Sequence, residues 1–215
     1  MSILKIDISK KTLNQIIKKE KIRLILFGET HGFISDETKH IEYLIKTFKP
    51  DIILYELLET KKLSTISSKN NFLKNLDNKK FSIISKQGDL KNIIRLAKKY
   101  NLPIEGCDLK NMGRRKTIIF NKKLTKKEMI KEEKIIDKRE KYHIKFIKKA
   151  MSKHNLCFVI LGAYHLRKNS PLLKSLNNSI IVYPTYKGKI EFKPDEIKSQ
   201  DKIIYVAKIL DNYKK

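Results

Sequence analysis

The fold of this chain is decided by one stretch of sequence, Leu24-Ile25-Leu26-Phe27-Gly28-Glu29-Thr30-His31. Its first four residues form an unbroken apolar run, which is typical of a strand buried on both faces of a parallel sheet. Gly28 permits a sharp turn at the carboxyl end of that strand, and a carboxylate and an imidazole follow it. Ligands bind at this edge of open α/β sheets, so the stretch predicts both a central strand and part of a polar site.

A second copy of the pattern lies far downstream, at Phe158-Val159-Ile160-Leu161-Gly162-Ala163-Tyr164-His165. Each copy continues with a short loop, a serine-capped helix and another apolar strand, at 51–56 and at 180–183. Two such units at equivalent points predict an ancient duplication. We therefore expect a single α/β domain over residues 1–215, with pseudo-repeat halves at 1–110 and 155–215 and a long helical connection at 111–154. The expected fold is a mixed, largely parallel central sheet flanked by helices.

The remaining segments give weaker structural signals. A capping box, Thr125-Lys126-Lys127-Glu128, opens a helix that is predicted to run to about residue 152. Further helices are expected at 6–19, 35–48, 89–100 and 171–176, and a short strand at 103–108. Two closing strands, at 189–192 and 203–209, are expected to be antiparallel and toward one edge. The polar segment 59–80 fits either a lid of short helices over the strand ends or a mobile excursion.

Composition restricts the class of protein. The formal net charge is +26, but the lysines are spread over every segment, so we expect weak, non-specific binding of polyanions and no specific nucleic-acid site. Cys107 and Cys157 lack the spacing of a disulfide framework or a thiolate zinc site and are expected to be buried. We find no candidate membrane span and no signal-peptide core, which predicts a soluble, cytoplasmic protein without a membrane partner.

The candidate site residues follow from the strand ends. His31 and His165 complete the two motifs, Glu29 stands in the first turn, and Glu56 ends the neighbouring strand after four apolar residues. A carboxylate ending a buried strand is costly unless it is paired or binds a cation, so Glu56 is a strong candidate. Asp108 ends another predicted strand and either joins the site or caps a loop. The other histidines fall in predicted lysine-rich helices and are expected at the surface: His40, His143 and His154.

These residues resemble a known family. The two Gly-x-x-His motifs and Glu56 are similar to those of the TraB/PrgY, GumN and Tiki group, within a wider set that includes erythromycin esterases and ChaN-like haem-binding proteins. The resemblance implies an α/β fold of two related halves with His31, Glu56 and His165 at the core of one site and Glu29 beside them. It also implies an arginine in the helix before the second motif. Arg139 is the candidate, followed by Glu140 where the family pattern has Asn.

Two imidazoles and a carboxylate favour a divalent metal site, for which Mn, Co, Fe and Zn are all chemically suitable. The metal ligands would be His31, His165 and Glu56, and Arg139 would stabilise a developing oxyanion. The preferred hypothesis is a metal-dependent hydrolase that cleaves a peptide, ester or amide bond in a peptide or small-molecule substrate. Without metal, His31 could act as general base with Glu56 orienting it.

Two other classes stay open from the sequence. One is a haem- or ligand-binding module using the same cleft, with Tyr164 as an available axial ligand. The other is a basic protein associated with nucleic acid, although the scattered Tyr and Phe and the absence of Trp offer no stacking stripe. The sequence does not define the metal, the substrate or the oligomeric state.

Overall fold

The structure is a computed structural model, and it describes residues 21–29, 37–78, 87–113, 125–167, 170–176, 179–183 and 203–205. Three predicted elements lie outside these residues, namely the helix at 6–19, the strand at 189–192 and the turn that carries His31. In the part of the chain that is described, no helix combines the length and the apolar character needed to cross a membrane.

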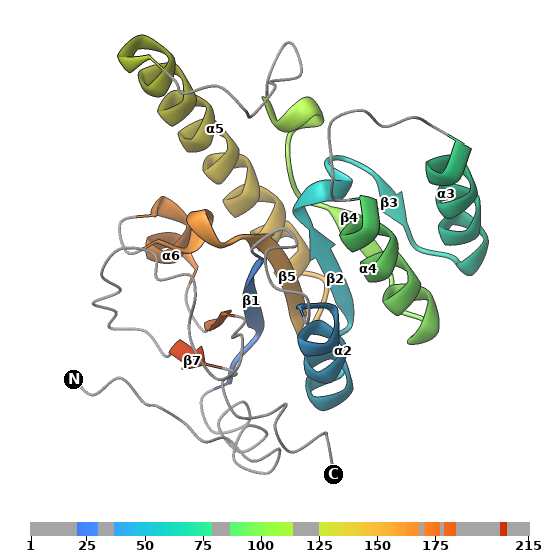
Figure 1. The fold of residues 1–215 in the computed structure, drawn as a ribbon. Helices are drawn as coiled ribbons and strands as arrows, with labels where there is room; N and C mark the ends of the chain where they lie inside the picture. Colours follow the sequence, from blue (N-terminus) through green and yellow to red (C-terminus); the bar gives the residue numbers. More distant parts are fainter. Residues whose placement is uncertain are drawn as a thin grey trace.

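The described residues form one sheet with the strand order β3-β4-β2-β5-β1-β6-β7 (Figure 1). Every neighbouring pair is parallel except β3 and β4, which confirms a mixed, largely parallel α/β fold. The strands are β1 (Leu24–Glu29), β2 (Ile52–Tyr55), β3 (Lys62–Leu63), β4 (Ile104–Gly106), β5 (Cys157–Gly162), β6 (Ser179–Tyr183) and β7 (Ile203–Tyr205).

The connection of β7 corrects one expectation. This strand does lie at an edge of the sheet, but it pairs parallel to β6, with Ile181 beside Ile203. A parallel pair needs a crossover of a dozen or more residues, and the segment 184–202 between these strands is long enough. The antiparallel prediction was wrong because local apolar patterns carry no information on strand direction.

Helices cover both faces of the sheet because alternate residues of each strand point to opposite sides (Figure 1). Ile25 and Phe27 belong to the core shared with α2 (Glu37–Phe48) and α4 (Gln87–Lys99). Leu24 and Leu26 belong to the core shared with α5 (Lys126–Met151) and α6 (Pro171–Ser175). All four of these β1 side chains are fully buried, as the unbroken apolar run predicts.

The two predicted units interlace at the centre of the sheet. The connection from β1 to β2 passes over β5, and the connection from β5 to β6 passes over β1 in the opposite direction. The strands β1 and β5 are therefore neighbours, with Glu29 beside Gly162 at their carboxyl ends. Such a divergence of connections is where open α/β sheets bind ligands. The arrangement is the one that a duplicated unit would give, and the duplication and the single-domain boundary stay predictions.

The segment 59–80 extends the sheet rather than covering the strand ends. Its β3 residues pair with Glu105 and Ile104 at the edge of the sheet, and α3 (Ile66–Asn78) follows. Leu76 of α3 is buried in the same core as Ile93 and Ile94 of α4. In Figure 1 the helix α3 lies at the far side of α4 from β5.

The helix termini follow the sequence signals. The side chain of Thr125 accepts a hydrogen bond from the backbone N–H of Glu128 and the reciprocal bond is present, which confirms the capping box of α5. Ser170 caps α6, with Pro171 at the first helical turn. The long helix α5 crosses behind the sheet and its N-terminal half extends beyond it (Figure 1), so that only its later turns pack on the strands.

Candidate functional site

Glu56 begins the short 3₁₀ helix η1 (Glu56–Leu58) directly after β2, at the carboxyl edge of the sheet. Its side chain is almost completely buried, yet both carboxylate oxygens are bonded. Oε2 accepts the backbone N–H of Gly162 at 2.5 Å, and Oε1 accepts a guanidinium N–H of Arg139. Glu56 therefore connects the end of β2 to the end of β5, as its position after four apolar residues suggested.

Arg139 joins Glu56 to a second buried carboxylate. Its Nε and Nη2 donate to the Oδ2 atom of Asp108 at 2.9 and 2.6 Å. Burial alone would lower the pKa of Arg139, but the charges of Glu56 and Asp108 raise it above its ordinary value. The structure thus brings Arg139, Glu56 and Asp108 together, and the question of whether Asp108 reaches this site is answered by these contacts.

A close backbone approach places Asp108 beside η1. Gly106 ends β4 where a Cβ atom would lie 2.1 Å from the carbonyl oxygen of Glu59, so no side chain fits. Around it, the backbone N–H of Gly106 donates to Lys61 O at 2.6 Å, and that of Asp108 donates to Glu59 O at 3.1 Å. These bonds hold the turn after η1 against the end of β4, and so fix the separation of Glu56 and Asp108.

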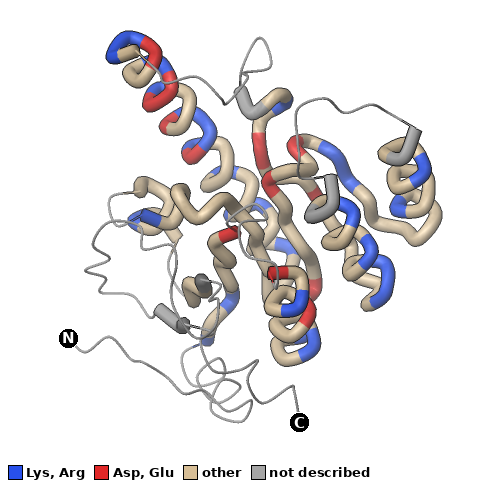
Figure 2. The backbone as a smooth tube through the Cα atoms, in the orientation of Figure 1, with Lys and Arg blue, Asp and Glu red and all other residues tan. Residues whose placement is uncertain are grey.

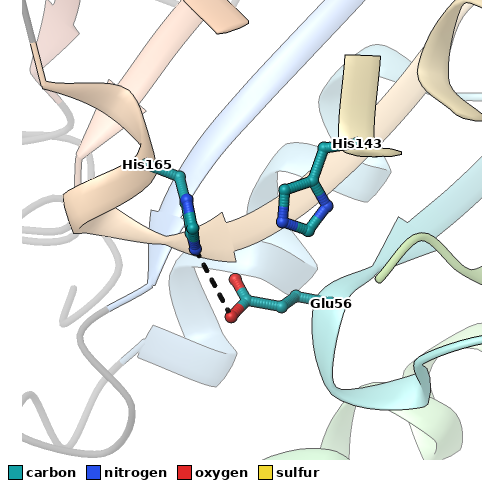
Figure 3. A group of neighbouring side chains, drawn as sticks. All are labelled: Glu56, His143 and His165. Carbon is teal, nitrogen blue, oxygen red and sulfur yellow. Dashed lines mark ion pairs between the residues drawn. The ribbon is translucent and has the colours of Figure 1, made fainter. Parts of the chain in front are cut away.

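Two imidazoles lie against this group of charges (Figure 3). His165 comes from η3 (Ala163–Leu166), which directly follows β5, and His143 comes from α5. Their ring centroids are 4.9 Å apart with an interplanar angle of 70°. The Nε2 atom of His165 lies 3.8 Å from Glu56 Oε1, and that of His143 lies 3.8 Å from Asp108 Oδ1.

The burial of His143 overturns the expectation that it lies at the surface. His143 is fully buried, because it lies on the face of α5 that packs against the rest of the molecule. That face is polar at Arg139, Glu140 and His143 and becomes apolar at Ile147 and Ala150. The expectation failed because lysines surround His143 in the sequence. A usable signal was present, since Arg139, His143 and Ile147 follow one another at intervals of four residues and must share a face.

Both imidazoles are oriented through their Nδ1 atoms. That of His143 lies 2.7 Å from the carbonyl oxygen of Cys107, which can only accept, so Nδ1 carries the proton. That of His165 lies 3.2 Å from Oε1 of Glu140, which is likewise an acceptor when ionised. Burial, together with the neighbouring His165, lowers the pKa of His143 and keeps this ring neutral. The Nε2 atom of His143 is buried and, among the described residues, has no hydrogen-bond partner.

Glu56, His143 and His165 form a group that could hold a metal ion, because one ligand atom from each lies within 4.8 Å of the others. Histidine ligands of metals usually donate their second ring N–H to a carbonyl or carboxylate, and both rings do so here. Glu56 and His165 belong to the predicted ligand set. The third predicted ligand, His31, lies outside the described residues, and sequence reasoning missed His143.

Two further predicted residues occupy other surroundings. Glu29 ends β1 and is buried, where its Oε1 accepts the hydroxyl of Tyr55 at 3.1 Å. The ring of Tyr55 belongs to the core under α2 and α4. Tyr164 is 51% exposed and its ring stacks under the guanidinium of Arg167, 4.5 Å from centroid to Cζ. The structure therefore does not bring Tyr164 into the Glu56 group.

The structure also tests the expected burial of the remaining histidines and of the two cysteines. His40 of α2 is fully buried, so the surface prediction for it was wrong: it shares the inner face of the helix with Ile41 and Leu44. His154 follows the end of α5 and is half-buried. Cys107 and Cys157 are buried free thiols, as expected. Burial raises the pKa of both, that of Cys157 to about 11, so neither is a candidate nucleophile.

Comparison with known proteins supports the fold and no more. No protein-family model matches this chain, and no curated protein does so either. The chain is similar to the structure of the type III effector HopBA1, at 17% identity over 85% of this chain and 87% of that one, with a TM-score of 0.50. It is also similar to ChaN of Campylobacter jejuni, solved with cofacial heme, at 17% identity over 83% and 87% with a TM-score of 0.40.

The likeness to the HopBA1 structure supports the overall fold alone, because an identity of 17% carries no function. Membership of the wider set that includes ChaN-like proteins stays a prediction, as does membership of the TraB, GumN and Tiki group.

Proposed function

We propose that this protein is a metal-dependent hydrolase that cleaves a peptide, ester or amide bond, with Glu56, His143 and His165 as the metal ligands. The observation that carries the proposal is that Glu56, His143 and His165 each offer one ligand atom within 4.8 Å of the others, while the Nδ1 atom of each imidazole faces an acceptor. The fully buried Nε2 atom of His143 has no hydrogen-bond partner among the described residues, which supports a ligand role for it.

The balance of charge also favours a cation. The group contains the carboxylates of Glu56, Asp108 and Glu140, and its guanidinium groups are those of Arg139 and Arg167. Among the described residues of this group, three carboxylates face two guanidinium groups. Several carboxylates buried together are costly, and a bound divalent cation would stabilise them. Which metal binds is not determined by these donors, because imidazole and carboxylate suit Mn, Co, Fe and Zn.

Each residue of the group has a part in the proposed reaction. Three protein ligands leave a coordination position for water, and the metal, when bound, would lower the pKa of that water and polarise the scissile carbonyl. Arg139 holds the Glu56 carboxylate in its orientation through Nη2 while Asp108 fixes the guanidinium plane. His31 and Glu29 remain candidates for contact with substrate.

The proposal is tested by metal content and by activity on the same protein. Metal is measured in the purified chain, removed with a chelator, and restored as Zn²⁺, Mn²⁺ or Co²⁺ during assays on peptide, p-nitrophenyl ester and anilide substrates. We expect hydrolysis that is lost with the metal and regained on its return. Loss of a residue that only orients a metal ligand lowers metal affinity by up to about 100-fold. We therefore expect His143→Ala and His165→Ala, which remove ligands themselves, each to lower it by at least about 100-fold. The matched control is His154→Ala, which lies outside the group.

Other outcomes separate the alternatives. Hydrolysis that survives chelation, with no metal in the protein, would leave an acid–base mechanism carried by histidine and glutamate. No hydrolysis, with a Soret band on adding haem that His165→Ala removes, would favour the ligand-binding module. The basic alternative has weaker support, because Lys and Arg are dispersed over several helices and alternate with acidic residues along α5 (Figure 2). It predicts polyanion binding that falls steeply with salt and is unaffected by His165→Ala.

A further inference from the structure

We propose that Glu140 is a positioning residue that fixes the tautomer and the ring orientation of His165, an inference that rests on the proposed metal site. It concerns the position where the family resemblance implies Asn and this chain has a carboxylate. The neighbouring Arg139 turns toward Glu56, whereas Glu140 turns toward the loop that carries His165. Consecutive residues of α5 thus hold two different ligands of the same group.

Glu140 has the contacts of a fixed side chain. It is fully buried, and its Oε1 atom lies 3.2 Å from Nδ1 of His165 and also accepts an N–H of Arg167. Its Oε2 atom accepts the hydroxyl of Ser170 at 3.0 Å. The same hydroxyl accepts the backbone N–H of Leu172 at 3.2 Å and caps α6. The carboxylate is therefore held at both oxygens and cannot turn away from His165 without losing the hydrogen bonds from Arg167 and Ser170.

These contacts determine which nitrogen of His165 carries the proton. An N–H of Arg167 donates to one oxygen of Glu140 and the hydroxyl of Ser170 donates to the other, so the carboxylate acts as an acceptor. Nδ1 of His165 is therefore the donor in its contact with Glu140, and Nε2 of the same ring faces Glu56. Free imidazole side chains prefer the opposite tautomer, with the proton on Nε2. Glu140 reverses that preference in favour of the ligand form.

The two imidazoles differ in the group that orients them. His143 donates to the neutral carbonyl of Cys107, and His165 donates to a charged carboxylate. A carboxylate in this position makes the imidazole a more basic ligand, and removing such an outer partner typically lowers metal affinity by about 10–100-fold. We therefore expect His165 to depend on Glu140 more than a purely structural contact would require.

The test measures tautomer and metal affinity on the same variants. Nitrogen-15 NMR of the metal-free protein at pH 8 reports which ring nitrogen of His165 is protonated, and Zn²⁺ affinity is measured by competition with a chelator. Glu140→Ala should shift His165 toward the Nε2–H tautomer and lower Zn²⁺ affinity by about 10–100-fold. Glu140→Gln keeps an acceptor oxygen but no charge, so it should retain the native tautomer and lose less affinity. The matched control is Glu133→Ala, an exposed residue on the same helix.

The outcomes distinguish this inference from the proposed function. Normal Zn²⁺ affinity and an unchanged tautomer in Glu140→Ala would overturn the positioning role while leaving the metal site intact. A native protein that binds no Zn²⁺, with a tautomer that still changes in Glu140→Ala, would overturn the metal site and leave the positioning role. Should Glu140→Ala not fold, Glu140→Gln decides alone, because a Zn²⁺ affinity equal to that of the native protein would contradict an effect of the carboxylate charge.

Discussion

The molecule contains two groups of carboxylates and cations that share their chemistry and differ in their surroundings. The buried cluster consists of Glu56, Asp108, Arg139, Glu140, His143 and His165 at the carboxyl edge of the sheet. The surface cluster consists of Glu42, Lys46, Lys99 and Tyr100, and it joins α2 to α4. The comparison distinguishes solvent-exposed ion pairs, which contribute a little stability, from buried charges, which are costly unless neighbouring groups pair with them.

In the surface cluster one carboxylate serves several donors in water. The Oε1 atom of Glu42 lies 2.8 Å from Lys99 Nζ, 2.6 Å from the Tyr100 hydroxyl and 3.4 Å from Lys46 Nζ. The lysine side chains are 60% and 44% exposed, so water replaces any partner that is removed. Pairs of this kind contribute about 0–1 kcal/mol.

In the buried cluster water cannot make that replacement. The side chain of Arg139 is 7% exposed and that of Asp108 is fully buried. Removing one member leaves its former partner with no solvent to replace the lost contact, and the cost is set by desolvation rather than by the lost attraction. The comparison therefore predicts that substitutions in the buried cluster lower the free energy of unfolding far more than substitutions in the surface cluster.

The largest expected effect is that of Arg139→Met. Met fills much of the same volume without charge, so the carboxylates of Glu56 and Asp108 face each other without the guanidinium that bridges them. We expect the free energy of unfolding to fall by about 3–5 kcal/mol, measured by urea denaturation at pH 7. Arg95→Met on the exposed side of α4 is the control and should change it by less than about 0.5 kcal/mol. A loss below 1 kcal/mol for Arg139→Met would show that the buried cluster behaves like the surface one.

Asp108→Asn should have the second largest effect. The amide retains one oxygen for the backbone N–H of Leu109, now bonded at 2.7 Å, but loses the charge that faces Arg139. Because Glu56 still pairs with the guanidinium, we expect a loss of about 2 kcal/mol, in the range for hydrogen bonds to charged groups. Asp137→Asn, exposed on α5, serves as the control. In the double variant with Arg139→Met the two losses should not add, and simple additivity would refute the proposed coupling.

The same contrast explains how much of this site the sequence predicts. Glu56 could be placed because it directly follows a buried apolar strand, and His165 because it lies three residues after the end of another. The carboxyl ends of parallel strands share one edge of the sheet. His143 could not be placed from its neighbours, because α5 carries charges on most of its surface. The spacing of His143 with Arg139 and Ile147 indicates a shared helix face, and packing against β5 and η3 identifies that face as the buried one.

Non-local pairing limits the prediction of the fold in a similar way. The apolar runs correctly identified the central strands and their largely parallel arrangement. They did not determine the direction of β7 or the role of 59–80, which adds β3 to the edge through pairing with Ile104 and Glu105. Direction and order depend on which strands meet across the sheet, and local periodicity contains no such information.

A smaller, pH-dependent effect is expected for Glu42→Gln. Hydrogen bonds from Lys99 and Tyr100 lower the pKa of Glu42 from its ordinary value of 4.5 to about 2. The stabilisation is therefore fully present above pH 4.5 and is lost as the pH falls toward 2, because the unfolded chain binds the proton first. At pH 7 we expect a loss of about 1 kcal/mol, reduced by solvent screening.

Urea titrations of the native protein and of Glu42→Gln from pH 7 to pH 3 test this dependence. The difference between the two proteins should stay constant down to about pH 4.5 and shrink from there to pH 3, while Glu133→Gln on α5 should differ from the native protein at no pH. A difference for Glu42→Gln that stays constant down to pH 3 would mean that the carboxylate charge contributes nothing, and that the hydroxyl bond from Tyr100 alone is responsible.

The smallest effect should come from Lys46→Met, which probes the weakest contact of the surface cluster. Lys46 lies four residues after Glu42 on α2, an arrangement that contributes about 0.3 kcal/mol in isolated helices. Met retains the apolar stem of the side chain, so the variant removes little besides the charge. Lys98→Met, exposed on α4, is the matched control for the loss of one positive charge from a strongly basic chain. In 1 M NaCl, where the Debye length is about 3 Å, the difference between the two variants should vanish. A difference that persists at this salt concentration would show that Lys46 contributes more than its charge to the surface cluster.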